Sequence, residues 1–255
     1  KEITESHIAL QEDDILVLCS DGVTSAGLGK TMPEGWGRQG LAEFLERWYR
    51  RDSSASHIAS MVVQTCEDLS LGAMDDDTTA VVFRLRRPQV VSIMIGPPEH
   101  PEMDEAVFRQ FFSSPGLHAV CGGTTVQAAA RFLNKPIVLL EDPATEKVPA
   151  ISRVEGIDLA TEGALTLSAV LSLGKLYAEG ECLPWDLHDR QDGASRIAKL
   201  LFEDATHIHI LAGQAINPAH TSQGIGVGFA EKLGMLQSLE QLLSKAGKEV
   251  SLSLC

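Results

Sequence analysis

Short apolar runs, separated by segments with helical periodicity, are the main pattern along this chain. In its first third, the apolar runs within residues 8–18 and 78–86 predict two strands. Between them, apolar residues at helical spacing predict two helices, the second of which is capped by Ser56. The first helix is expected to bury one face, made of Leu41, Phe44, Leu45 and Trp48.

The pattern changes after residue 89, because near-continuous apolar runs now alternate with helical segments. The expected strands are residues 90–95, 117–121, 137–140, 156–160, 207–211 and 250–254. The expected helices are residues 106–112, 126–133, 165–179, 195–203 and 229–246. This alternation predicts an α/β fold, similar to the doubly wound type, whose mostly parallel sheet is covered on both faces.

A basic cluster followed by proline separates the two patterns. Residues 84–88 read Arg-Leu-Arg-Arg-Pro, and a proline ends a strand because it cannot donate to the ladder of hydrogen bonds. We therefore expect two domains, residues 1–87 and residues 88–255.

The charge and the cysteines limit the classes of protein to which the chain can belong. A formal net charge of −14 argues against a nucleic-acid partner and against an anionic membrane surface, since both would repel it. No apolar run reaches the roughly 18–20 residues that span a bilayer. Five scattered cysteines without a Cys-x-x-Cys pair fit a reducing compartment, so we expect a cytoplasmic protein.

Two aspartates are the best candidates for functional residues in the first domain. Asp21 follows the apolar run that ends at Leu18, and Asp76 precedes the run that begins at Ala80. Strand ends hold a short carboxylate rigidly, and hard cations such as Mg²⁺ or Mn²⁺ prefer carboxylate oxygens completed by water. The alternative is two ordinary aspartate-rich turns.

The sequence motifs around these aspartates favour the metal site. The stretch from Leu10 to Val23, which contains Leu-Cys-Ser-Asp-Gly-Val, and the later Asp-Asp-Thr-Thr resemble metal-dependent protein phosphatases of the PPM (2C) type. They look closest to the bacterial stage II sporulation E-like branch. The resemblance implies an α+β phosphatase lobe that removes phosphate from phosphoserine or phosphothreonine in a phosphoprotein substrate, by means of a metal-activated water.

The same resemblance assigns roles to individual residues. It implies that Asp21 and Asp76 bind Mn²⁺ or Mg²⁺, and that Gly22 lets the backbone turn tightly beside the ion. The acidic triplet leaves the second ligand open by one position, so Asp75 and Asp77 are alternatives to Asp76.

The resemblance also implies that part of the phosphatase lobe, with further metal-binding aspartates, is missing. Members of this family supply further metal-binding aspartates from segments that precede the Ser-Asp-Gly strand. We therefore expect an incomplete lobe with impaired activity. Its uncovered strand edges are expected to associate with a missing N-terminal segment or with a second copy in a homodimer.

The second domain has its own candidate site, at loops that follow its expected strands. Gly-Gly-Thr-Thr ahead of a helix offers free amides and the positive end of the helix dipole, which favour a small anion. The candidate ligand-binding residues are Gly122, Gly123, Thr124, Thr125, Glu162, Asn217 and His220. The alternative is a plain turn in which Thr124 or Thr125 caps the helix. A regulatory or sensor module that binds such a ligand is the rival to the phosphatase function, with residues 1–87 as a non-catalytic remnant.

Two other features of the second domain allow a chemical interpretation. Cys121 stands where a helix is expected to begin, a setting that can lower a thiol pKa, so a catalytic thiol is an alternative to ordinary burial. His207 and His209 alternate on one strand and share a face, where they could bind a metal or simply be satisfied histidines of the sheet.

Overall fold

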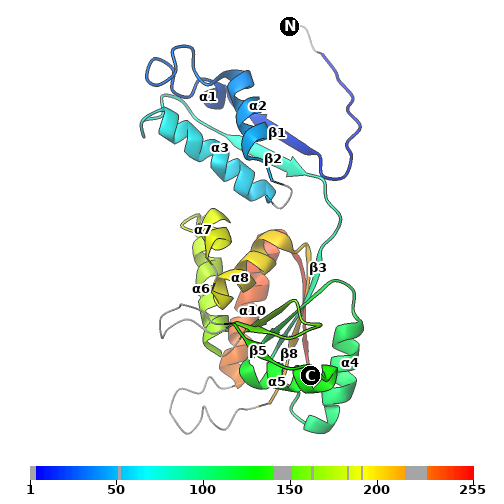
Figure 1. Cartoon of the computed structure of the whole chain (residues 1–255). Coiled ribbons are helices and arrows are strands. Elements are labelled where there is room, and N and C mark those ends of the chain that lie inside the picture. Colours follow the sequence, from blue (N-terminus) through cyan, green and yellow to red (C-terminus); the bar gives the residue numbers. More distant parts are fainter. Residues whose placement is uncertain are drawn as a thin grey trace. The chain divides into compact units, whose positions relative to one another are not determined.

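The structure is a computed structural model that describes residues 4–50, 53–140, 151–161, 164–182, 184–190, 192–215 and 229–255. The chain divides into two compact units, Lys1–Arg87 and Pro88–Cys255 (Figure 1). No helix of the described residues has the length and apolar character needed to cross a bilayer.

The first unit packs three helices on one face of a two-stranded sheet. Its elements are β1 (Ile15–Cys19), α1 (Asp21–Thr24), α2 (Gly37–Trp48), α3 (Ala55–Leu69) and β2 (Ala80–Arg84). The strands are antiparallel, with Ile15 opposite Arg84 and Cys19 opposite Ala80. The buried core of this unit is Val23, Ala26, Leu41, Val62 and Cys66.

The other face of this small sheet is apolar and exposed. Leu16 lies opposite Phe83, and Leu18 lies opposite Val81. Each of these four side chains is between 37% and 54% exposed. The two-stranded sheet is therefore covered by this unit on one face only.

The helix α2 differs in one respect from the sequence-based expectation. Leu41 is buried, and Phe44 packs against the ring of Trp36 with ring centroids 5.3 Å apart. Trp48 is 49% exposed, so its predicted burial is wrong. It is the last residue of the helix, where the apolar stripe has already passed beyond the small core.

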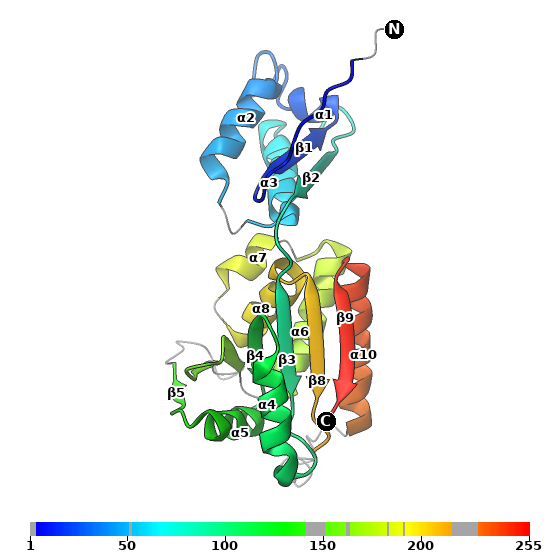
Figure 2. The ribbon, with the colours of Figure 1, turned by 90° about the vertical axis from the view of Figure 1, so that its right-hand side faces the viewer.

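The second unit is built on a seven-stranded sheet. Its strands are β3 (Val90–Ile95), β4 (Leu117–Cys121), β5 (Val138–Leu139), β6 (Ile151–Arg153), β7 (Leu159–Thr161), β8 (His207–Ala212) and β9 (Glu249–Leu254). They lie in the order β5-β6-β7-β4-β3-β8-β9. The strands β7, β4, β3, β8 and β9 are mutually parallel, while β5 and β6 add an antiparallel edge. Figure 2 shows β3, β8 and β9 running side by side in the same direction.

Helices cover both faces of this sheet. The helical elements are η1 (Pro101–Met103), α4 (Asp104–Ser113), α5 (Gly123–Leu133), α6 (Ala164–Glu179), α7 (Pro184–Asp189), α8 (Gly193–Ala198), the π-helical turn η2 (Lys199–Asp204) and α10 (Phe229–Lys245). Val91, Ile93 and Ile95 of β3 pack with α6, α7, α8 and α10. Met94, on the opposite side of β3, packs with α4 and α5. The expectation of a mostly parallel sheet covered on both faces is confirmed.

Two short elements, β6 and α7, were not expected from the pattern. The strand β6 and the helix α7 contain three and six residues, which is too short for either periodicity to be recognised. The strand β7 begins at Leu159 rather than at Gly156. Asp158 just before it accepts a hydrogen bond at Oδ2 from the backbone amide of His118, at 2.7 Å.

Candidate metal centre and ligand loops

Hydrogen bonds of Ser20 bring the two aspartate-containing segments together. The backbone amide of Ser20 donates to the carbonyl of Thr79, at 3.0 Å. The Ser20 hydroxyl accepts from the amide of Thr79 and donates to the carbonyl of Asp77, both at 3.0 Å. The β1–β2 ladder thus continues one position past Cys19, and Asp21 begins α1 beside the Asp76–Thr78 loop.

Gly22 allows a close approach between these two segments. A Cβ atom at this position would lie 2.5 Å from the carbonyl oxygen of Asp77 and 2.9 Å from Oγ1 of Thr78. The resemblance attributed this glycine to a tight backbone turn. In the structure its φ is not in the left-handed region, and the reason for glycine is the space taken by the neighbouring loop.

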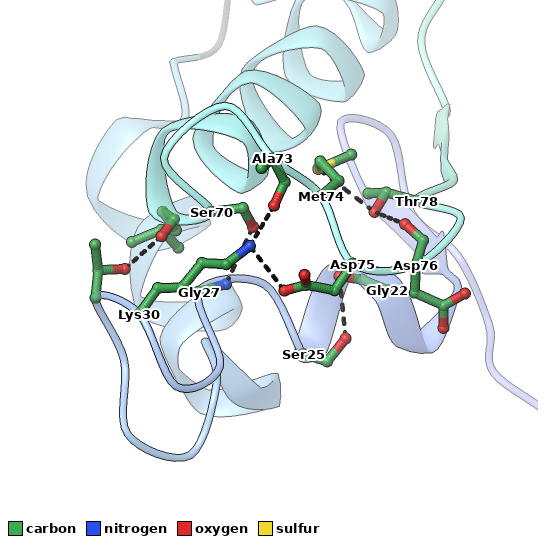
Figure 3. Close-up of polar contacts among 12 residues, drawn as sticks. Gly22, Ser25, Gly27, Lys30, Ser70, Ala73, Met74, Asp75, Asp76 and Thr78 are labelled. Carbon is green, nitrogen blue, oxygen red and sulfur yellow. Dashed lines mark hydrogen bonds and ion pairs between the residues drawn. The ribbon is translucent and has the colours of Figure 1, made fainter.

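The three aspartates of the acidic triplet have different surroundings. Asp75 forms an ion pair with Lys30, with 2.8 Å between Oδ2 and Nζ. Asp76 accepts at Oδ1 from the amide of Asp77, at 2.8 Å. Figure 3 shows the carboxylate of Asp75 directed toward Lys30 and that of Asp76 directed away from it. The ion pair with Lys30 therefore engages the carboxylate of Asp75, so that Asp76 and Asp77 are the carboxylates of the triplet that could bind a cation.

These residues fit one kind of cation site better than another. Asp21, Asp76 and Asp77 are all exposed. Across the described ranges, no group of three or more His, Cys, Asp and Glu side chains is arranged to hold a metal ion. Mg²⁺ is commonly held by one or two carboxylates and several waters. The described carboxylates therefore do not form a closed protein cage, and a site for Mg²⁺ or Mn²⁺ here would need waters for most of its ligands.

Lys30 belongs to a glycine-rich segment that is tied to the end of α3. Its ammonium group donates to the carbonyl of Ala73 as well as pairing with Asp75 (Figure 3). Thr31 donates from its hydroxyl to the carbonyl of Leu69, at 2.6 Å. Lys30 was not predicted as part of the site, because the sequence shows it only as a single lysine in a glycine-rich segment.

The Gly-Gly-Thr-Thr segment of the second unit lies at the start of α5. The helix begins at Gly123, three residues before its expected start, because Gly122 serves as N-cap with a φ of 109°. Neither threonine caps the helix, so that alternative is wrong. The Thr125 side chain is fully buried, and its hydroxyl has no hydrogen-bond partner in the described part of the chain. Glu162, Asn217 and His220 lie outside the described residues.

The structure argues against two alternative chemistries in this unit. Burial raises the pKa of the Cys121 thiol to about 11, which disfavours the reactive thiolate. His207 pairs with Glu249, with 3.3 Å between Nε2 and Oε2, and Nδ1 of His209 lies 2.8 Å from the Ser251 hydroxyl. Both histidines thus have partners on the neighbouring strand, as expected for histidines of a sheet.

One comparison with known proteins concerns the first unit. Residues 1–86 match the family model described as stage II sporulation protein E (SpoIIE), and this part of the chain is a SpoIIE domain. The rest of the chain is not assigned to a family. Searches of curated proteins and of solved structures gave no match.

Proposed function

We propose that the first unit contributes to a Mn²⁺- or Mg²⁺-dependent protein phosphatase that acts on phosphoserine or phosphothreonine in proteins. The observation that carries this proposal is the Ser20 bridge, which joins Asp21 to the Asp76–Thr78 loop. The SpoIIE match over residues 1–86 supports the same function.

Each residue of the site has a role in this proposal. Asp21 and Asp76 would hold the cation, with Asp77 as the alternative to Asp76. When bound, the cation supplies an activated water and a positive charge for the phosphoryl oxygens. Ser20 keeps the two segments in register, and Lys30 compensates the charge of Asp75. A site that offers two carboxylates holds such a cation weakly, so we expect slow hydrolysis by this chain alone.

The test is hydrolysis of a phosphopeptide with Mn²⁺, comparing Asp21→Asn with Asp68→Asn. Asp68 is an exposed aspartate on α3, so its variant makes the same change of charge outside the site. We expect Asp21→Asn to reduce the Mn²⁺-dependent rate by more than about 100-fold, and Asp68→Asn to leave it within about twofold. Equal rates for the two variants would contradict the proposal.

A second proposed function is the binding of a small anion by the second unit, in a sensor or regulatory role. The start of α5 presents free backbone amides. The specific observation in its favour is the buried, unpaired hydroxyl of Thr125. Thermal unfolding separates the two functions. Stabilisation by Mn²⁺ that is lost in Asp21→Asn favours the phosphatase, whereas stabilisation by an anion alone favours the sensor.

The cysteines support a proposed cytoplasmic location. All five are free thiols, as is usual where glutathione keeps thiols reduced.

A further inference from the structure

The strand order of the second unit defines the place where its chain reverses direction across the sheet. After β3 the chain forms β4, continues to the far edge of the sheet at β5 and comes back through β6 to β7, next to β4. It then crosses to the other side of β3 to form β8 and β9. The reversal lies between β3 and β8. In open α/β sheets, ligands bind beyond the carboxyl ends of the strands at such a switch point.

Three glycines form a row at this edge of the sheet. Gly122, Gly96 and Gly213 directly follow the last residues of β4, β3 and β8, and those last residues are partners in the sheet register. The amide of Gly213 donates to the carbonyl of Ile95, at 3.0 Å. Side chains are thus absent from three neighbouring strand ends, and the backbones pack closely there: a Cβ atom at Gly213 would lie 2.2 Å from the carbonyl oxygen of Gly96.

Lys232 brings a positive charge to this row of glycines. It is the fourth residue of α10, and its ammonium group donates to the carbonyl of Gly213. A Cβ atom at Gly96 would lie 2.8 Å from this ammonium nitrogen, so glycine at that position leaves the space that Lys232 uses. The ammonium group therefore lies at the ends of β3 and β8, on the switch point.

The charge of Lys232 is only partly compensated by the described residues. Burial lowers its pKa because the charged form loses water, and the neighbouring Cys255 thiol offsets part of this effect. The Lys232 cation also stands near the amino-terminal end of α10, where the helix dipole is positive. Within the described residues Lys232 forms no ion pair with a carboxylate, and the ring centroid of Phe229 lies 5.5 Å from its nitrogen. A bound anion would relieve both costs.

We propose that this switch point binds a small molecule carrying a phosphate or carboxylate group, with Lys232 as the charge that holds it. The inference rests on the second proposed function and extends it from α5 to β3 and β8. Two strand spacings separate Gly122 from Gly213, roughly 10 Å. A ligand with two anionic groups can therefore contact Lys232 with one group and the amides at the start of α5 with the other.

Isothermal titration of the full chain tests this site, with inorganic phosphate, ribose 5-phosphate and malate as probes. EDTA is present throughout, so that a cation in the first unit cannot contribute to binding. We expect at least one probe to bind, and its identity distinguishes phosphate from carboxylate recognition. Lys232→Met should weaken that binding by about tenfold or more, because a charge-assisted hydrogen bond is lost. Lys245→Met, an exposed lysine at the other end of α10, should change it by less than about twofold.

Thr125→Val separates this inference from the proposal on which it rests. If Thr125→Val weakens binding while Lys232→Met does not, the anion site at α5 stands and the role of Lys232 is overturned. If no probe binds to the wild-type chain, both are overturned. If the thermal unfolding of Lys232→Met is unchanged, its loss of binding does not come from unfolding. If methionine does disturb the fold, Lys232→Arg replaces it as the test: this variant keeps the charge and should retain binding, and loss of binding in a folded Lys232→Arg would contradict the role of the charge.

Discussion

The sheets of the two units contain equally apolar strands but bury them to different extents. In the second unit, Val91 to Ile95 of β3 are all buried, because helices cover both faces of the sheet. In the first unit, β1 reads Ile-Leu-Val-Leu-Cys, and yet Leu16 and Leu18 are exposed. A continuous apolar run usually indicates a strand buried on both faces. The sequence of β1 and β2 therefore suits a sheet covered on both faces, whereas the helices of this unit cover one face only.

The candidate sites of the two units also differ in how far their residues are buried. In the first unit the acidic site is made of exposed side chains, held by hydrogen bonds between loops. In the second unit the proposed anion site lies at the ends of buried parallel strands, which fix its glycines in register.

Truncation of one phenylalanine in each unit should have very different effects on stability. Phe108 is fully buried under α5, whereas Phe83 is 54% exposed on the uncovered sheet face. Phe108→Ala should lower the free energy of unfolding of the second unit by about 3–5 kcal/mol through cavity formation. Phe83→Ala should change that of the first unit by less than about 1 kcal/mol. Urea unfolding at a protein concentration low enough to keep the chain monomeric measures both. Similar losses for the two variants would contradict the exposure of Phe83 in the monomer.

Substitution of one glycine in each unit should shift stability in opposite directions. A Cβ atom at Gly22 would overlap the Asp77 carbonyl, so Gly22→Ala should destabilise the first unit by about 1–3 kcal/mol. Gly234 lies in α10 with no heavy atom within 4 Å of a built Cβ, so Gly234→Ala should stabilise the second unit by about 0.5–1 kcal/mol. Thermal unfolding measures both changes. A neutral Gly22→Ala would mean that the loops of the acidic site are not closely packed.

The uncovered face of the small sheet should mediate association, as large exposed apolar patches usually do. The proposed partner is a second copy of the chain, and Phe83→Lys places a charge in the centre of the apolar face. We expect this variant to weaken self-association by about tenfold or more, as measured by sedimentation at several concentrations. Leu71→Lys is the control, because Leu71 is 71% exposed and lies outside the sheet. A wild-type chain that is monomeric at all concentrations would exclude the homodimer.

The sequence predicted those parts of the fold that depend on long local patterns. The apolar runs of β3, β4, β8 and β9 and the helical periodicity of α6 and α10 extend over enough residues to be recognised. The start of α5 at Gly123 was missed, because it depends on the positive φ of Gly122 rather than on an apolar pattern.

The details of the two sites were less predictable, because they depend on contacts between distant residues. The segments around Asp21 and Asp76 could be found from their sequence motifs alone. The contacts that Lys30 makes with Asp75, and Lys232 with Gly213, have no local pattern. Only the folded chain brings these residues together.

Removal of the Lys30 charge should have the smallest effect on stability and an informative effect on the acidic site. Asp75 is 70% exposed although Lys30 is only 25% exposed, and water screens a pair with one exposed partner, so Lys30→Met should cost about 1 kcal/mol or less in unfolding free energy. The same change leaves Asp75 without its counter-charge beside Asp76 and Asp77. An additional free carboxylate attracts a hard cation, so we expect Mn²⁺ to bind the variant more tightly, by about twofold to tenfold. Titration with Mn²⁺ at low and high salt measures the effect, with Lys245→Met as the control for net charge. Weaker binding in Lys30→Met would instead mean that the lysine positions the acidic loop for the cation. The acidic site would then depend on a long-range contact, as the proposed anion site of the second unit does.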